Sequence, residues 1–599
     1  MLDLTPAALV KTILAKLEAA LAAQDLDAAL DLFGAECFWR DLISFTWNIK
    51  TLEGPDEIRA MLASCLAQTE PKNWSLKEDE AIAEDGGVIL AWHSFETKVA
   101  RGVGLVRIKD GKIWALLTSM AELKGYEEQI GVTRPFGARQ GAHPGARSWA
   151  EEREVEIAAI GRTVQPYVLI IGGGQGGMAL GARLRQLNVP TLIVDRHERP
   201  GDAWRKRYKS LCLHDPVWYD HMPYLEFPRN WPVYSPKDKI ADWLEMYAKV
   251  MELNYWTRTA ATKAAYDPET KQWAVEVDRA GERATLRPKH LVFATGMSGK
   301  PNMPRFKGQE LFRGEQQHSS QHPGPDAYRG KRVVVIGSNN SAHDICAALY
   351  EAGVDVTMVQ RSSTLVVRSE VMAQVGLREL YSERSIARGI TVDKADLMFA
   401  AIPFRLLARL QKPAFDKIRE IDRDFYAGLE KAGFLLDFGE DDTGLFTKYI
   451  RRGSGYYIDV EASQLVIEGK IKLAVGQVAA LTEDSVVLEN GARLPADLIV
   501  YATGYSSMNG WIADLIDQTT ADRVGKVWGV GSDTALDPGP WEGELRNMWK
   551  PTQQEALWLQ GGNLHQSRHY SLFLALQLKA RMEGLATPVY GLPAVHHTA

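Results

Sequence analysis

The sequence predicts an α/β chain in which two units of alternating strands and helices are nested, with a smaller α+β unit before them. Three observations support this fold class. An apolar strand, a glycine-rich turn, a helix and a second strand occur at residues 167–196 and again at 332–362. The first 130 residues instead combine helical periodicity with strand-like runs. A chain of 599 residues is also too long for a single hydrophobic core.

The composition is that of an ordinary globular enzyme, with 45% hydrophobic and 24% charged residues. The formal net charge of −6 argues against nucleic acid or anionic lipid as the main partner. The four cysteines are widely spaced and form no CxxC pair, so they suit neither a disulfide framework nor a zinc site and favour a reducing compartment. The N-terminal residues lack a basic start followed by an apolar block, so we expect no signal peptide, and the sequence contains no run of 18 apolar residues. We therefore expect a cytoplasmic protein with no membrane and no metal site.

The first unit begins with helical periodicity over residues 7–32, followed by a short helix near Gly54. Strand-like runs then occupy 86–123, and Asp110-Gly111 predicts a tight hairpin turn within them. A long helix beside a curved antiparallel sheet resembles the conical ketosteroid isomerase/SnoaL-like and nuclear-transport-factor-like domains. Such a cone can hold a ligand pocket, which Asp41 or His93 would line. We prefer a structural role for both residues. The cone could also join two copies of the chain as a homodimer.

The segment at 167–196 contains every part of a dinucleotide-binding βαβ unit. The strand Val168–Ile171 runs into Gly172, Gly174 and Gly177, spaced as GxGxxG. These glycines allow the tight turn, the approach of the backbone to a pyrophosphate, and close packing of helix on strand. The helix N-terminus then favours the negative charge of the pyrophosphate. Asp195 follows the second strand at the right distance to accept hydrogen bonds from a ribose, which indicates FAD or NAD rather than a 2′-phosphate.

The segment at 332–362 repeats this unit with different chemistry at its end. Gly337 opens the turn and Ala342 takes the position of the third glycine. Arg361, with the hydroxyl of Ser362, stands where the first unit has its aspartate and could bind a 2′-phosphate, which indicates NADPH. The alternative is a solvated surface arginine. Asn339 replaces the middle glycine; asparagine tolerates a left-handed backbone, but its Cβ should hold the cofactor slightly away.

Residues 166–590 resemble the class B flavoprotein monooxygenases, which include flavin-containing monooxygenases, YUCCA enzymes and Baeyer–Villiger enzymes. PGDAWRKRYKSLCLHDP at 200–216 resembles the second FAD segment of the family. The ATG motifs at 294–296 and 502–504 match two segments where strands end and the chain crosses between domains. GGNLHQSRHY at 561–570 resembles the last FAD contact, in which a helix N-terminus points at the flavin.

Between the ATG motifs, FRGEQQHSSQHP resembles the family fingerprint FxGxxxHxxx followed by an aromatic residue. Phe312, Gly314 and His318 match. His322 stands where flavin-containing monooxygenases usually have Tyr or Phe and Baeyer–Villiger enzymes have Trp, and Pro323 follows it as in the second group. The type of oxygenation therefore stays open. We expect His318 to have a linker or conformational role rather than to transfer protons.

The resemblance implies FAD and NADPH as cofactors, with dioxygen and a small organic substrate (amine, sulfide, 2-oxo acid or ketone) as reactants. Reduced flavin would form a C4a-(hydro)peroxide that transfers one oxygen atom, so the protein must exclude water. No residue need act as nucleophile; Asn340 is the one catalytic candidate, because it could place NADP⁺ near the flavin. The expected FAD contacts are Gly172, Gly174, Gln175, Gly177, Asp195, Trp204, His214, Thr295, Asn563 and Leu564. The expected NADPH contacts are Gly337, Ser338, Asn340, Ser341, Arg361 and Ser362.

These observations predict two nested Rossmann-like dinucleotide-binding domains preceded by an α+β cone-shaped domain. The expected division is a ketosteroid isomerase/SnoaL-like domain at 1–130, a linker at 131–165, the first part of the FAD-binding domain at 166–328, an NADPH-binding domain with a helical insertion at 329–465, and the second part of the FAD-binding domain at 466–599.

Heteroatom oxidation or decarboxylation of a 2-oxo acid slightly outranks Baeyer–Villiger insertion as the reaction. A flavin disulfide reductase or another NAD(P)H dehydrogenase is a rival, but the reductase needs a redox cysteine pair and Cys212 has no close partner in sequence. A degenerate flavin-binding sensor is the remaining alternative, supported only by Asn339 and His322.

Overall fold

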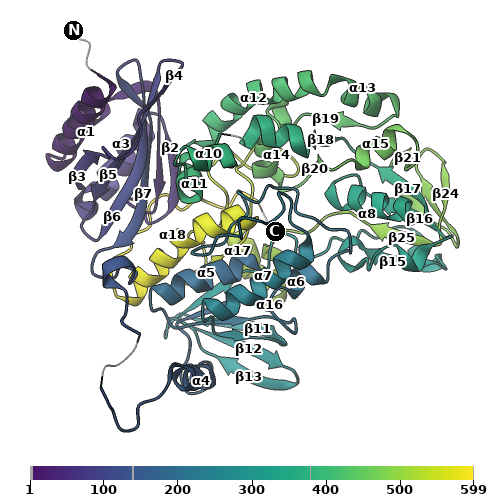
Figure 1. The fold of residues 1–599 in the computed structure, drawn as a ribbon, viewed down its shortest axis with the longest axis horizontal. Coiled ribbons are helices and arrows are strands. Elements are labelled where there is room, and N and C mark those ends of the chain that lie inside the picture. Colours follow the sequence, from purple (N-terminus) through teal and green to yellow (C-terminus); the bar gives the residue numbers. More distant parts are fainter. Residues whose placement is uncertain (1–4, 138–140, 378, 598–599) are drawn as a thin grey trace.

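A computed structural model describes residues 5–137, 141–377 and 379–597. Figure 1 shows the N-terminal α+β unit (purple) at one end of the molecule, beside the helices α10 (Glu383–Ala387), α11 (Val392–Ala400) and α18 (Leu564–Met582). A parallel sheet built around one glycine turn lies in the middle of the molecule, and a similar sheet lies at the far end. In the described ranges, no helix is both long and apolar enough to cross a bilayer.

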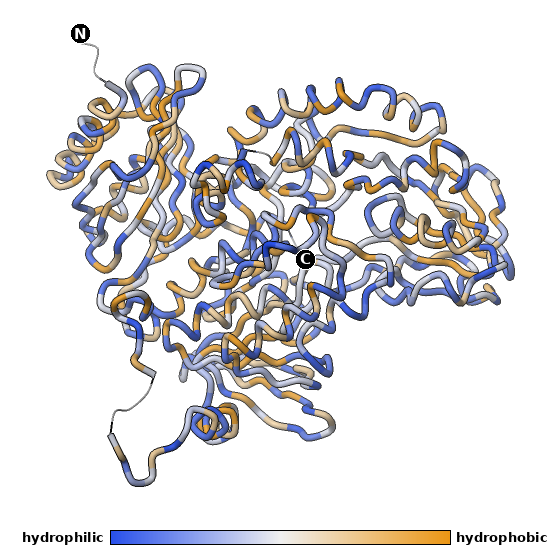
Figure 2. The backbone as a smooth tube through the Cα atoms, viewed as in Figure 1, coloured by the Kyte–Doolittle hydropathy of each residue, from blue (hydrophilic) through white to orange (hydrophobic). Residues whose placement is uncertain are grey.

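The N-terminal unit wraps helices against a mixed sheet with strand order β2-β1-β7-β6-β5-β3, in which β4 also pairs with β5. Figure 2 shows hydrophobic and hydrophilic residues interspersed along its strands. Asp110 and Gly111 have φ of 52° and 73°, so the predicted hairpin turn between β6 and β7 is confirmed. The elements are α1 (Pro6–Ala22), α2 (Leu26–Leu30), β1 (Phe33–Leu42), β2 (Ile49–Glu53), α3 (Pro55–Thr69), β3 (Lys72–Leu76), β4 (Ala83–Asp85), β5 (Val88–Glu96), β6 (Ala100–Lys109) and β7 (Lys112–Leu123).

The single helix expected over 7–32 is wrong, because the chain breaks between α1 and α2. Gln24 has φ of 54°, which ends the first helix. Asp25 then caps the second, since its side chain accepts a hydrogen bond from the Ala28 amide at 3.0 Å.

Aromatic side chains fill the interior of the cone. Trp39, Phe45 and Phe95 are each at most 2% exposed, and His93 stacks on Trp74 with ring centroids 5.2 Å apart. Gly102 leaves room for this packing, because a Cβ there would lie 2.2 Å from the Phe95 ring.

Asp41 and His93 are both fully buried in this cone. The Asp41 carboxylate accepts hydrogen bonds from the backbone amides of residues 44–46 and from the Thr118 hydroxyl, which fix the bend after β1. The His93 ring bonds the Leu117 carbonyl through Nε2 at 3.1 Å. Both sets of contacts are structural.

The first glycine turn belongs to an all-parallel sheet of order β10-β9-β8-β14-β26. Helix α5 packs against α18 and α7 beside it. The last strand of the sheet, β26, comes from the C-terminal part of the chain. All strands of the second parallel sheet therefore precede β26 in the sequence. Its elements are β8 (Val168–Ile171), α5 (Gln175–Gln186), β9 (Thr191–Val194), α6 (Asp202–Arg205), α7 (Lys237–Val250), β10 (Tyr255–Trp256), β14 (His290–Phe293) and β26 (Leu557–Leu559).

The second sheet is also parallel, with order β15-β25-β16-β17-β21, and helix α8 follows its glycine turn. It lies in sequence between β14 and β26, so the two Rossmann-like folds are nested as predicted. The α/β fold class with a preceding α+β domain is therefore confirmed. Its elements are β15 (Glu315–His318), β16 (Arg332–Ile336), α8 (Asn340–Glu351), β17 (Asp355–Gln360), β21 (Lys472–Val475) and β25 (Leu498–Tyr501).

A mainly helical insertion separates β17 from β21 and includes α10 and α11. Its amphipathic helix α12 lies beside the N-terminal unit in space, because Arg409 at the exposed side of α12 pairs with Glu36 of β1. The remaining elements are β18 (Thr364–Arg368), α9 (Ser369–Met372), α12 (Phe404–Ile421), α13 (Arg423–Lys431), β19 (Leu436–Asp437), α14 (Leu445–Arg452), β20 (Tyr456–Asp459) and α15 (Ala462–Ile467).

Outside these sheets lie smaller elements. An isolated helix, α4, precedes β8, and two antiparallel sheets of order β11-β12-β13 and β22-β23-β24 flank the parallel ones. These elements are α4 (Trp149–Ala159), β11 (Thr259–Asp267), β12 (Gln272–Arg279), β13 (Glu282–Leu286), β22 (Val478–Leu481), β23 (Ser485–Leu488), β24 (Arg493–Pro495), α16 (Asn509–Leu515) and α17 (Gln518–Val524).

Candidate functional site

The first glycine turn connects β8 to α5 and has a shape that only glycine allows. Gly172 has φ of 105°, and an added Cβ would lie 2.4 Å from the Ala294 carbonyl oxygen. At Gly177 a Cβ would lie 2.0 Å from the Gly172 oxygen, so helix and strand are in close contact there. At Gly174, by contrast, no atom of the described residues lies within 4 Å of an added Cβ. Open space therefore lies over the N-terminus of α5, where an anion is favoured.

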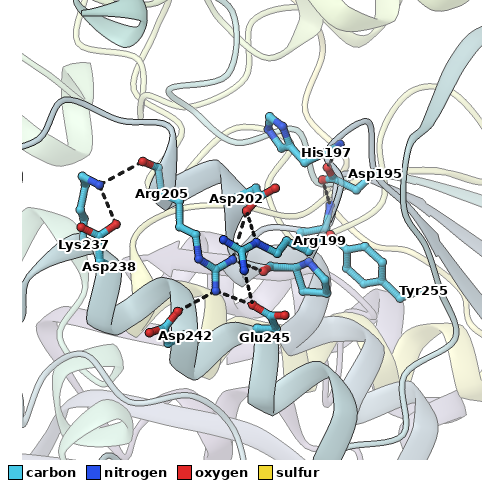
Figure 3. A network of polar contacts seen from close by, with 12 residues as sticks. Asp195, His197, Arg199, Asp202, Arg205, Lys237, Asp238, Asp242, Glu245 and Tyr255 are labelled. Carbon is cyan, nitrogen blue, oxygen red and sulfur yellow. Dashed lines mark hydrogen bonds and ion pairs between the residues drawn. The ribbon is translucent and has the colours of Figure 1, made fainter. Parts of the chain in front are cut away.

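Asp195 follows β9 and closes this turn. Its carboxylate accepts hydrogen bonds from the Gly173 amide at 2.7 Å and the His197 amide at 2.8 Å, and Figure 3 shows it beside His197 and Tyr255. The Tyr255 hydroxyl donates to the Gly173 carbonyl at 3.0 Å. A carboxylate has about four acceptor positions, so Asp195 retains acceptors for a ribose.

Trp204 lies in α6, where a polar network holds it. Its indole Nε1 donates to Gln175 Oε1 at 3.2 Å, at the first residue of α5. Arg205 joins α6 to α7 through Asp242 at 2.8 Å and Glu245 at 2.5 Å, as Figure 3 shows. The network thus fixes Trp204 and Gln175 beside the glycine turn.

Thr295 and Asn563 follow β14 and β26, the neighbours of β8 in the sheet. The Thr295 hydroxyl is buried and has no hydrogen-bond partner in the described ranges. Asn563 caps α18, because its side chain accepts from the Gln566 amide at 2.9 Å, and Leu564 behind it is 2% exposed. The carboxyl edge of one sheet therefore brings together the glycine turn, Asp195, Thr295 and Asn563, which is where α/β sheets bind ligands.

The second turn repeats the contact that shapes the first. Gly337 has φ of 133°, and a Cβ there would lie 2.3 Å from the Ala502 oxygen, just as Gly172 meets Ala294. Each ATG motif thus places an alanine carbonyl against the first glycine of one turn. The left-handed backbone considered for Asn339 is wrong: its φ of −101° and ψ of −167° are extended, as at the helix cap Gly174.

The residues expected to bind the second nucleotide surround this turn. Arg361 follows β17, is exposed, and forms no ion pair or hydrogen bond among the described residues. Ser362 beside it is also exposed. Ser338 is buried and its hydroxyl bonds that of Thr364 at 2.8 Å, while Ser341 lies in the first turn of α8.

His214 and Asn340 lie where the segment at 200–216, α8 and β20 meet. The Asn340 carboxamide oxygen accepts from the Ile458 amide at 3.0 Å, and His214 Nδ1 donates to the Ile458 carbonyl at 2.8 Å. His214 Nε2 lies 3.2 Å from Asp344 Oδ2, which also accepts from the Tyr208 hydroxyl. Both ring nitrogens thus face acceptors. Burial disfavours the charged form of the His214 ring, but the nearby Asp344 carboxylate outweighs this effect and raises the pKa of His214.

Comparison with known proteins agrees with this geometry. Residues 169–390 match the family described as pyridine nucleotide-disulphide oxidoreductase, and residues 14–116 match the SnoaL-like domain. The indole-3-pyruvate monooxygenase YUCCA1 of Oryza sativa subsp. japonica is 28% identical over 364 residues, which are 60% of this chain and 82% of that protein. The probable indole-3-pyruvate monooxygenase YUCCA10 of Arabidopsis thaliana is 27% identical over 356 residues, 59% and 85% of the two chains. The chain is an NADPH-dependent flavin monooxygenase with an N-terminal SnoaL-like domain.

Among solved structures, the flavin-containing monooxygenase from Stenotrophomonas maltophilia aligns with a TM-score of 0.46 at 17% identity, covering 70% of this monooxygenase and 99% of that chain. All four cysteines of the sequence are described and are free thiols. Cys212 is half-buried and its thiol contacts the Tyr234 carbonyl at 3.4 Å. The monooxygenase therefore has no cysteine pair of the kind that a disulfide reductase needs.

The fingerprint histidines of the monooxygenase have structural contacts. His318 Nδ1 accepts from the Ser320 amide, and Nε2 donates to the Gly504 carbonyl at 3.0 Å, so the ring ties β15 to the second ATG motif. His322 stacks on Tyr328 with centroids 5.7 Å apart, and burial lowers its pKa to about 4. His322 is therefore a neutral, stacked ring that fills the place of the aromatic residue.

Sequence reasoning missed a buried cluster at the N-terminus of α18. Asp396 of α11 accepts two hydrogen bonds from Arg568, at 2.8 Å each, and one from the Tyr381 hydroxyl. Burial opposes ionisation of Asp396, but Arg568 and His565 hold its pKa far below the usual range. The members are far apart in sequence and match no motif, so only the Arg/His-rich start of α18 hinted at them.

Proposed function

We propose that this monooxygenase holds FAD at the first glycine turn and NADPH at the second, and transfers one oxygen atom from dioxygen to a small organic substrate. The observation that carries the proposal is the difference between two otherwise equal turns. Gly172 and Gly337 meet an alanine carbonyl in the same way, but Asp195 ends the first unit and the unpaired Arg361 ends the second. A carboxylate suits a ribose, and a guanidinium suits a 2′-phosphate.

The first turn fits FAD by two further features. The space over Gly174 admits a pyrophosphate, and the partnerless Thr295 hydroxyl offers a hydrogen bond at the same sheet edge. When bound there, FAD would supply hydride acceptance from NADPH and activation of dioxygen. Asn563 and Leu564 would direct the α18 N-terminus toward the flavin, where its partial positive charge stabilises an anionic ring.

The remaining task of the chain is to exclude water. Aromatic side chains gather at the start of α18, where the Tyr219 ring stacks on His565 with centroids 4.4 Å apart. Beside them is a cavity of about 20 Å³ lined by His214, Tyr219 and Phe446, among others, which has room for about one water molecule. A dry, narrow space beside the flavin would favour oxygen transfer over release of hydrogen peroxide.

We infer that the substrate is an amine, a sulfide, a 2-oxo acid or a ketone. The YUCCA relatives carry the name indole-3-pyruvate monooxygenase, and indole-3-pyruvate is a 2-oxo acid, so this class ranks with heteroatom oxidation above the ketones. Baeyer–Villiger oxidation of a ketone remains the alternative.

The purified protein should be yellow, with one FAD per chain, and should consume NADPH and oxygen together. Oxygen uptake with a panel of 2-oxo acids, sulfides, amines and ketones, with peroxide measured in parallel, identifies the class. A protein that takes up no FAD, or that oxidises NADPH without oxygen, would overturn the proposal.

A further inference from the structure

The SnoaL-like domain is joined to the rest of the chain by buried charges. Arg40 of β1 is 2% exposed and pairs with Glu544 through two hydrogen bonds of 2.7 and 2.8 Å. The Thr51 hydroxyl of β2 donates to the same carboxylate at 2.6 Å. Burial would lower the pKa of Arg40, but Glu544 raises it above the usual value, so the guanidinium stays charged. A buried bidentate pair demands one fixed geometry, so the domain is docked rather than tethered.

The same face of the domain supplies donors to the carboxyl end of α11. Arg40 Nη1 donates to the Ala400 carbonyl at 2.6 Å, and Arg107 Nη1 donates to the Ala401 carbonyl at 2.5 Å. The last carbonyls of a helix have no partner within it, and they carry partial negative charge. The two guanidinium groups therefore satisfy these carbonyls and fix the position of α11. Burial lowers the pKa of Arg107 to about 10, so it too is charged at neutral pH.

Helix α11 in turn holds the start of α18. Asp396, in the middle of α11, binds Arg568, whose Nη1 also donates to the carbonyls of Tyr219 at 2.9 Å and His221 at 2.7 Å. Arg568 lies little more than one turn after Asn563 and Leu564. The position of α11 is thus transmitted to the residues that would face the flavin.

α11 also contributes to the aromatic group beside the small cavity. The Phe399 ring lies edge-on to His565 at 5.8 Å and contacts Phe446 at 5.8 Å. Tyr219 and Phe446 both line the cavity of about 20 Å³. A shift of α11 would therefore disturb the aromatic packing beside this space, and a gap opened there next to polar groups would admit water.

Aromatic side chains occupy the place inside the domain where a ligand would bind. Its interior is filled by the aromatic side chains of the cone, and Gly102 and Gly104 are needed to fit the rings of Phe95 and His93. Polar groups that reach out of the cone, Arg40 and Arg107 among them, contact the rest of the chain instead.

We propose that the SnoaL-like domain is a fixed outer support of the oxygenation site. Arg40 and Arg107 are positioning residues: they hold the end of α11, and α11 holds the aromatic group that keeps water out. This inference rests on the proposed function, because it assigns the domain a role in the coupling of NADPH oxidation to oxygenation.

Arg107→Ala in the full-length holoenzyme tests the proposal. Within the described ranges the Arg107 side chain donates one hydrogen bond, to the Ala401 carbonyl, and makes no ion pair, so its loss should leave the overall fold and the FAD content unchanged. NADPH oxidation should stay within about twofold of wild type, while the peroxide formed per NADPH rises severalfold and product falls in proportion. Arg107→Lys keeps a charged donor and should restore most of the coupling. Arg59→Ala, which removes an exposed ion pair with Asp27 in the same domain, is the matched control and should leave coupling unchanged.

Amide hydrogen exchange gives a readout that does not depend on turnover. Exchange over residues 392–401 and at the start of α18 should be faster in Arg107→Ala than in wild type or Arg59→Ala. Unchanged exchange and unchanged peroxide yield in Arg107→Ala would overturn the inference, as would equal changes in Arg59→Ala. If wild type itself oxygenated nothing in the panel, the proposed function would fall, while the exchange data would still decide whether Arg107 positions α11.

Discussion

The substitution Arg361→Ala tests whether the second glycine turn selects NADPH over NADH. Arg361 follows β17, is exposed, and has no acidic partner in the described part of the chain. Its neighbour Gln360 is fully buried and bonds the backbone of Leu435, so the strand end is held without the arginine. The substitution should therefore change the free energy of unfolding by less than about 0.5 kcal/mol, as is usual at the surface.

The effect on cofactor use should be much larger. A hydrogen bond to a charged group contributes about 1.5–3 kcal/mol, and each 1.4 kcal/mol is tenfold in affinity. Because Arg361 is exposed, solvent screening places the loss at the low end of that range. The KM for NADPH should rise roughly tenfold, with little change in kcat. NADH has no 2′-phosphate, so its KM should change less than about twofold.

Steady-state NADPH and NADH oxidation with oxygen uptake measures both constants on the same preparation. Arg361→Lys should give an intermediate KM for NADPH, because it keeps the charge but loses the planar fork. Equal losses with both nucleotides would refute the reasoning, since they would show that Arg361 does not read the phosphate.

Three further predictions concern the first turn and the SnoaL-like domain. Gly174→Val adds a side chain where no atom of the described chain lies within 4 Å, so the fold should persist while FAD is lost; a variant that purifies fully yellow would sink the assignment. Burial lowers the pKa of His93 from 6.5 to about 4. Between these two pH values the unfolded chain binds more protons at this residue than the folded chain does. The free energy of unfolding therefore falls as the pH drops through this window, by up to about 3 kcal/mol. His93→Gln should show a shallower decline in the free energy of unfolding between pH 7 and 5, and an unchanged slope would contradict this. Glu544→Gln leaves the charge of Arg40 buried without its carboxylate partner. It should lower the free energy of unfolding, measured by urea denaturation, by about 3–5 kcal/mol. Glu78→Gln, in the exposed pair with Lys11, is the control and should lower it by less than about 1 kcal/mol.

The parts of the fold that sequence predicted correctly have local signals. The glycine spacing, the apolar strands and the hairpin at Asp110-Gly111 each specify their structure within a few residues. Local rules also explain the errors: Asp25 is a good helix cap and could have shown the break after α1, and the cap position of Asn339 requires an extended backbone.

Contacts between distant segments could not be read in the same way. Arg40 and Glu544 are 504 residues apart, and neither belongs to a motif. Asp396 and Arg568 likewise meet only because α11 packs on α18. The role of His322 could not be predicted from the sequence because it depends on tertiary packing. The ring stacks on Tyr328 and is buried, and burial lowers its pKa so that the ring is neutral.

The carbonyls of Ala294 and Ala502 set an order for biosynthesis. The carbonyl of Ala294, which packs against Gly172, becomes available only after β14 has been synthesised. The sheet that contains β8 still lacks β26 and the helix α18 until translation is nearly finished. The second fold, whose strands all lie between those two points, can be complete on the ribosome first. Nascent chains should therefore remain colourless until release, and premature termination anywhere before residue 557 should yield a product that cannot retain flavin.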